Sequence, residues 1–124
     1  IYTEFLVDYD DYRKGMEMMA RLEVQTLCLG HKYVLTGPEA RAHILHSLEQ
    51  AAGYVAMVED FLHAERGNID RAVARVKARE WDPKPVPKQP ESAYILNTQA
   101  RVKTILERIQ RNSGVAGHSH APAV

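Results

Sequence analysis

Residues 26–38 read TLCLGHKYVLTGP, and the change from strand to helix within this segment is the basis of our fold prediction. The apolar run is too short for a helix and is bounded by Gly30, which predicts a buried strand near Val24 to Leu29. Gly30 permits a sharp turn of the backbone, so we expect the imidazole of His31 at the edge of a sheet. That position suits a metal ligand. The same residues are also explained by an ordinary loop histidine that binds no metal.

A helix-start signal follows the predicted strand directly. Thr36 or Gly37 can cap a helix whose first residue is Pro38. Apolar residues then recur every three or four positions, at Ile44, Leu48, Ala51, Val55, Val58 and Leu62. This spacing predicts a single helix from about Pro38 to about Arg66, near 40 Å long at about 1.5 Å per residue, which Gly67 ends.

The part of the chain before the strand predicts a shorter helix, from Asp8 to about Arg21, after an extended lead-in at residues 1–7. Its apolar positions at helical spacing are Tyr12, Met16, Met19 and Ala20. Acids crowd its first turn, where the helix dipole favours them. The run Asp8 to Asp11 could also bind a hard cation, but its acids already have this structural explanation.

The part after Gly67 predicts two further helices. Asn68 can cap a short helix that closes at Trp81, and the four prolines between Asp82 and Pro90 require an extended connector. A last helix begins at Glu91 or Ser92. Its basic residues could touch RNA or phosphate, and a solvated charged face explains them more simply. Residues 112–124 are expected to be a disordered tail.

Composition limits the classes of function. The 124 residues suit one domain, and 16 basic residues balance 16 acidic ones, which makes nucleic acid an improbable partner. No stretch is long and apolar enough for a membrane span, and no signal peptide is visible. Cys28 is the only cysteine; we expect it to be a small buried side chain in a reducing, cytoplasmic compartment.

Other histidines offer weaker metal sites. His43 and His46 are three positions apart on the long helix, but no acid between them completes an HExxH arrangement. His118 and His120 in the tail lack a fixed third ligand. Composition and periodicity alone therefore predict a mainly α protein with one or two short strands.

The segments 10–22, 26–31 (TLCLGH) and 34–40 (VLTGPEA) resemble the C-terminal part of metallo-β-lactamase-fold hydrolases, the superfamily of glyoxalase II. In those αββα enzymes a helix precedes a final core strand that ends in Gly-His, and this histidine binds zinc. The resemblance implies that His31 is a metal ligand. It also divides the chain into the end of that fold (1–37), a helical extension (38–111) and the tail (112–124).

Two features depart from the family. Many relatives carry Pro-Gly-His-Gly, whereas here Leu29 precedes Gly30 and Lys32 follows His31. The HxHxDH ligand cluster and the bridging aspartate have no counterpart in these residues, because they belong to the N-terminal part of that fold. The chain, which starts at Ile1 without a Met, is therefore expected to be a C-terminal fragment that is inactive alone.

The resemblance implies zinc-dependent hydrolysis in the full-length enzyme, with a pair of zinc ions and a small ester, thioester, lactone or phosphodiester as substrate. The helical extension would cap the active site. We also expect self-association, because the fragment would otherwise expose Phe5, Leu6, Leu27 and Leu29. The alternative is a small helical protein–protein interaction module without catalysis, which needs no metal. An HxHxDH sequence upstream of Ile1 would decide between the two.

Overall fold

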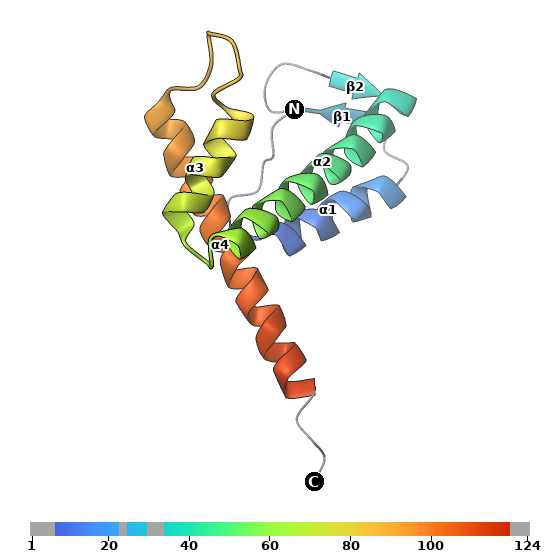
Figure 1. The fold of residues 1–124 in the computed structure, drawn as a ribbon. Coiled ribbons are helices and arrows are strands. Elements are labelled where there is room, and N and C mark those ends of the chain that lie inside the picture. Colours follow the sequence, from blue (N-terminus) through green and yellow to red (C-terminus); the bar gives the residue numbers. More distant parts are fainter. Residues whose placement is uncertain (1–6, 23–24, 30–33, 120–124) are drawn as a thin grey trace. The chain divides into compact units, whose positions relative to one another are not determined.

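The computed structural model describes residues 7–22, 25–29 and 34–119, with side chains as far as Gly114 (Figure 1). The elements in chain order are α1 (Tyr9–Arg21), β1 (Thr26–Cys28), β2 (Val34–Thr36), α2 (Gly37–Ala64), α3 (Ile69–Glu80) and α4 (Glu91–Ser119). The prediction of a mainly α chain with one or two short strands is confirmed. None of the helices in the described ranges combines the length and the apolar composition that a membrane crossing needs.

The chain divides into two compact units, Ile1–Tyr54 and Val55–Val124. Helix α2 contributes its first part to one unit and its last part to the other.

Helix α1 opens the first unit as the sequence predicts. Asp8 is its N-cap, and the carboxylate accepts a hydrogen bond from the backbone N–H of Asp11 at 3.1 Å. Asp10 and Asp11 occupy the first turn and Arg21 the last, which matches both ends of the helix dipole. The acidic run is therefore accounted for by the start of the helix.

The prediction that this strand is buried is wrong. Strand β1 pairs only with β2 in an antiparallel ribbon, and the described residues contain no further strand (Figure 1). Thr26 and Cys28 are exposed while Leu27 is half-buried, because a two-stranded ribbon has no second layer to cover both of its faces. Cys28 is thus an exposed thiol and not the expected buried side chain. This architecture does not fit the metallo-β-lactamase assignment of the described part.

The start of α2 carries most of the buried side chains of the first unit. The helix begins at Gly37, whose φ of +53° a glycine adopts without strain, and Pro38 follows as predicted. The buried side chains of this unit are Tyr9, Ala40, Ile44, Ser47 and Ala51. Because most of them are small, the first unit has a thin core.

Helix α2 ends earlier than predicted, and the residue that first leaves the helical conformation is not Gly67. The last helical residue is Ala64, and Arg66, with φ of +54°, is the first residue in the left-handed region. Gly67 N–H donates to the carbonyl of Leu62 at 2.8 Å and Arg66 N–H to that of His63 at 3.2 Å. These are the two bonds of a Schellman motif, in which the left-handed position usually holds glycine.

The second unit has a fuller core. Asn68 caps α3 by accepting a bond from Arg71 N–H at 3.0 Å, as predicted, and α3 packs against α4. Helices α2, α3 and α4 all contribute buried side chains: Val55, Met57, Val58, Leu62, Ala72, Val73, Val76, Tyr94, Thr98, Val102 and Ile105. On α2, the predicted three-and-four spacing supplies Val55, Val58 and Leu62 to this core.

The predicted disordered tail needs a correction. Helix α4 begins at Glu91 as expected but continues to Ser119, so residues 112–119 are helical. Glycine lowers helix stability by only about 1 kcal/mol, and the first residue that would break the helix is Pro122. Residues 120–124 of the predicted tail lie outside the described residues.

The Schellman motif leads to a stability prediction. Arg66→Gly should raise the free energy of unfolding of the second unit by about 1 kcal/mol, because glycine adopts a positive φ without the strain that a Cβ causes. Urea unfolding followed by the fluorescence of Trp81, the only tryptophan, measures this.

Arg66→Ala is the matched control. Alanine also carries a Cβ, so this variant removes the guanidinium but keeps the strain, and its stability should stay near that of the original chain. Equal gains for glycine and alanine would mean that the arginine side chain, and not its backbone, was unfavourable.

Candidate functional site

His31, the metal ligand that the resemblance implies, lies outside the described residues. The structure places the residues that flank its segment: Cys28 of β1 pairs with Val34 of β2 across the antiparallel ribbon. A role for His31 in metal binding therefore stays a prediction.

The opposite end of the ribbon is joined to the two helices of the first unit. Gly37 N–H, at the start of α2, donates to the carbonyl of Gln25 at 2.8 Å. One turn further along α2, the Arg41 guanidinium donates from Nη1 to the carbonyl of Ala20, near the end of α1, at 3.3 Å. A cation beside the last carbonyls of a helix is favourable, so these bonds hold the start of α2 against the end of α1.

A hollow lies beside these bonds. It has a volume of about 360 Å³ and is lined by Met19, Ala20, Gln25, Gly37, Pro38, Arg41 and Ile44. We call it the α1–α2 hollow. Its walls are mostly apolar, with the Arg41 guanidinium and the Gln25 amide as polar side chains, and its size falls within the range of small-molecule sites.

The second unit has a hollow of its own, of about 440 Å³, lined by Glu59, Asp60, Leu62, His63, Arg66, Gly67, Leu106 and Ile109. Its side chains include both acids and bases. Glu59 is also paired with Arg108, whose Nη1 lies 2.9 Å from Oε1. This mixture favours neither sign of charge in a ligand.

The acidic run and the helical histidines do not assemble a metal site in the structure. Asp8 caps α1, and Asp10 lies 3.6 Å from the guanidinium of Arg13. His43 is half-buried and His46 exposed on α2. Among the residues that the structure describes, no three histidine, cysteine, aspartate or glutamate side chains gather closely enough to hold a metal ion. The side chains of His118 and His120 lie outside that part.

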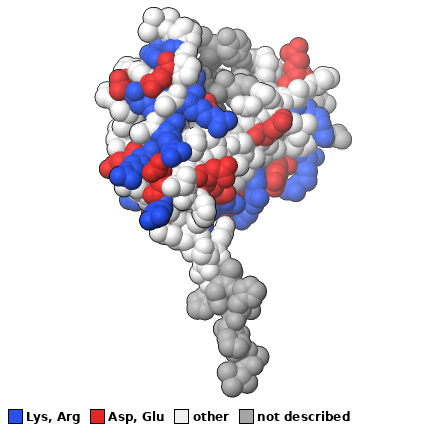
Figure 2. Space-filling view, viewed as in Figure 1, with Lys and Arg blue, Asp and Glu red and all other residues white. Residues whose placement is uncertain are grey.

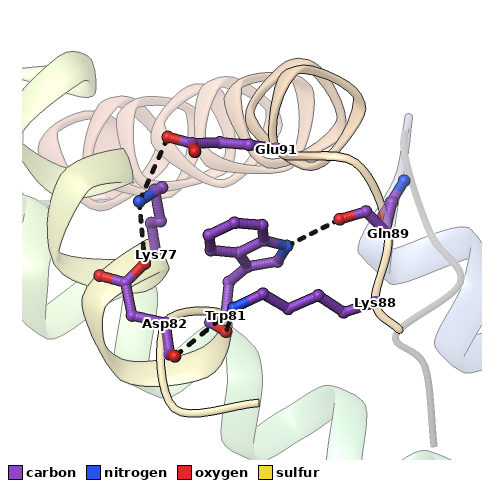
Figure 3. Close-up of polar contacts among 6 residues, drawn as sticks. All are labelled: Lys77, Trp81, Asp82, Lys88, Gln89 and Glu91. Carbon is purple, nitrogen blue, oxygen red and sulfur yellow. Dashed lines mark hydrogen bonds and ion pairs between the residues drawn. The ribbon is translucent and has the colours of Figure 1, made fainter. Parts of the chain in front are cut away.

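Trp81, at the C-terminal end of α3, is the centre of a polar cluster whose other members the sequence did not reveal (Figure 3). Its indole N–H donates to the carbonyl of Gln89 at 3.0 Å. Lys88 Nζ lies 3.6 Å from the centre of the indole ring and donates to the Trp81 carbonyl at 3.0 Å. The same lysine thus supplies a cation–π contact and caps the carbonyl end of α3.

Lys77 completes the cluster from within α3. Its Nζ lies 2.8 Å from a carboxylate oxygen of Asp82 and 3.3 Å from one of Glu91, in the first turn of α4 (Figure 3). The hydrogen bond to Asp82 is the main cause that raises the pKa of Lys77 above its ordinary value, and Glu91 adds to it. The lysine therefore links the end of α3, the connector and the start of α4.

Part of this cluster was visible in the sequence. A lone tryptophan at a helix end, followed by a proline-rich connector, marks a turn that a large side chain can close. The partners were not visible, because Lys88 and Gln89 reach Trp81 only once the connector has turned back. The cluster joins segments by contacts among its own members, so we assign it a structural role.

Charged side chains of both signs alternate on the face shown in Figure 2. The chain as a whole carries no formal net charge. A mixture of this kind gives the face shown no single sign of charge.

Comparison of the chain with protein-family models, with curated proteins and with solved structures found no match.

The Trp81 cluster gives a second stability prediction. Lys88→Met keeps most of the aliphatic chain but removes the charge, so the cation–π contact and the bonds to the α3 carbonyls are lost. We expect the free energy of unfolding of the second unit to fall by about 1–2 kcal/mol in urea.

Lys103→Met is the matched control, since Lys103 is an exposed lysine of α4. It should change the free energy of unfolding by less than about 0.5 kcal/mol, as is usual for surface substitutions. A Lys88→Met variant as stable as this control would show that the cluster adds nothing to stability.

Proposed function

We propose that this chain is the C-terminal part of a zinc-dependent hydrolase of the metallo-β-lactamase type, with His31 as one metal ligand. The observation that supports the proposal is the order along the chain: helix α1, strand β1, the Gly30-His31 pair, strand β2, and a long helix starting at Gly37-Pro38. A helix, a strand and a Gly-His pair follow one another in the same order where the family has its last zinc-binding histidine, whereas the isolated ribbon of β1 and β2 is not the core sheet of that fold.

The chemistry of the proposal is metal-assisted hydrolysis of a small ester, thioester, lactone or phosphodiester. Zinc would lower the pKa of a bound water and polarise the oxygen of the scissile group. A catalytic zinc usually has three protein ligands, and the described residues contain no group of three. His31 would therefore act with ligands from elsewhere in a longer, cytoplasmic protein, and the chain alone would be inactive.

His31→Ala in the full-length protein tests the proposal. Loss of a direct ligand should reduce zinc content and the hydrolytic rate sharply, by tenfold or more, while the helical content remains. Zinc is measured by elemental analysis, the rate with ester and phosphodiester substrates, and the helical content by circular dichroism.

His46→Ala is the control, because this exposed histidine of α2 belongs to no metal-binding group in the described part of the chain. It should keep both zinc and rate. If His31→Ala also keeps full zinc and full rate, the hydrolase proposal is wrong.

A helical interaction module is the second candidate, and a specific observation favours it. Met18 and Leu22, four positions apart on or next to α1, are 55% and 66% exposed. Residues at this spacing share one side of a helix, and a large apolar surface in water often marks a contact with another protein. Val34 and Leu45 of the same unit are also largely exposed.

Self-association through this side of α1 can be measured by sedimentation velocity. If it occurs, Leu22→Glu should raise the dissociation constant by tenfold or more, since burial of a charged carboxylate in place of an apolar side chain is unfavourable. Leu96→Glu is the matched control, because Leu96 is 67% exposed on α4 in the other unit. A monomer at every concentration, or equal effects of both variants, would contradict this candidate.

A further inference from the structure

We propose that the α1–α2 hollow binds a small organic carboxylate with an apolar body. This proposal does not rest on the metal ligand proposed at His31, and it requires neither zinc nor a catalytic function. Its evidence comes from the first unit alone.

The walls of the hollow favour an apolar ligand body. Met19 and Ala20 come from the end of α1, and Pro38 and Ile44 from the start of α2. Ile44 is fully buried, whereas Met19 and Ala20 are half-buried, so the hollow leads from solvent toward the core. A volume of about 360 Å³ is at the small end of the range for ligand sites.

Arg41 gives the hollow its sign of charge. Its bond to the Ala20 carbonyl uses Nη1, and a guanidinium has five N–H donors in a planar fork. Among the described residues, the ion pairs do not include Arg41. A carboxylate could therefore accept bonds from Arg41 without displacing an acid of the described part.

The position of Arg41 in the helix strengthens the preference for an anion. It lies in the second turn of α2, close to the positive end of the helix dipole. The guanidinium itself is bonded to a carbonyl at the end of α1, and a bound anion would interact favourably with the guanidinium and with the start of α2. The Gln25 amide is the other polar side chain of the hollow and can donate to the same ligand.

The apolar walls distinguish the ligand class from simple inorganic anions. Phosphate or sulfate would leave Met19, Pro38 and Ile44 without an apolar partner. A neutral apolar molecule would leave the Arg41 charge uncompensated. A monocarboxylate with a short alkyl or aryl chain satisfies both parts of the hollow.

The test uses the complete chain, labelled with ¹⁵N, and three probes: hexanoate, hexanol and inorganic phosphate. Hexanoate should shift the amide signals of Ala20, Gly37 and Arg41 in a saturable manner. Hexanol, with the same chain but no charge, and phosphate should bind at least tenfold more weakly. Equal binding of hexanol and hexanoate, or no saturable shift with hexanoate, would overturn the proposal.

Two variants locate the site. Arg41→Met should weaken hexanoate binding by about tenfold or more, whereas Arg21→Met, which changes an arginine at the end of α1 that does not line the hollow, should not. Ala20→Leu keeps Arg41 and fills the hollow, so it should also block binding. Undiminished hexanoate binding in Ala20→Leu would place the ligand elsewhere and overturn the proposal even if Arg41→Met fails to fold.

The outcome is independent of the hydrolase proposal. His31→Ala should leave hexanoate binding unchanged, because the hollow lies at the end of the ribbon where Gly37 N–H donates to Gln25, and the segment of His31 is flanked by the Cys28–Val34 pair at the other end. Loss of zinc in His31→Ala with unchanged hexanoate binding would support both proposals, whereas retained zinc would remove only the hydrolase.

Discussion

The apolar side of α2 is the constraint on which both compact units depend. A single helix, Gly37–Ala64, supplies Ile44 and Ala51 to the buried side chains of the first unit and Val58 and Leu62 to those of the second. Each unit then completes its core with different partners. Because the helix has no proline after Pro38 and no other break before Ala64, its three-and-four spacing has to serve two cores in succession.

The two cores are unequal, and the difference explains the distribution of polar contacts. The second unit buries large side chains from three helices, and its connector is fixed by the Trp81 cluster. In the first unit the buried residues are mostly small, and a short ribbon takes the place of a third helix. The bonds between Gly37 and Gln25 and between Arg41 and Ala20 therefore add to a small amount of apolar burial in this unit.

The helices could be predicted from the sequence almost completely, because their signals are local. Asp8 and Asn68 cap helices as expected, and prolines mark the connector between α3 and α4. The strands could not be predicted to the same degree. A short apolar run does not indicate whether a second layer covers the strand. We predicted a buried strand and a buried Cys28, whereas the structure has a ribbon in which Thr26 and Cys28 are exposed.

The same distinction between local signals and contacts made only in the fold applies to the candidate sites. His31 was found by a local motif, Gly-His after a strand, which identifies a residue but not its neighbours. The Trp81 cluster and the α1–α2 hollow depend on residues that meet only through the fold, such as Lys88 with Trp81 and Arg41 with Ala20. No spacing rule connects those pairs.

The two candidate functions differ in whether another part of a protein covers the ribbon. A two-stranded antiparallel ribbon of three-residue strands is marginal in water, and both of its outer edges carry backbone groups that can pair with a further strand. A hydrolase would extend the ribbon edge to edge into a larger sheet, and the exposed Cys28 and Val34 would then gain a second layer. An interaction module would instead cover the Met18 and Leu22 side of α1 and leave the ribbon edges in water. The two candidates thus require different surfaces of the same small unit to be buried, one through backbone pairing and the other through apolar side chains.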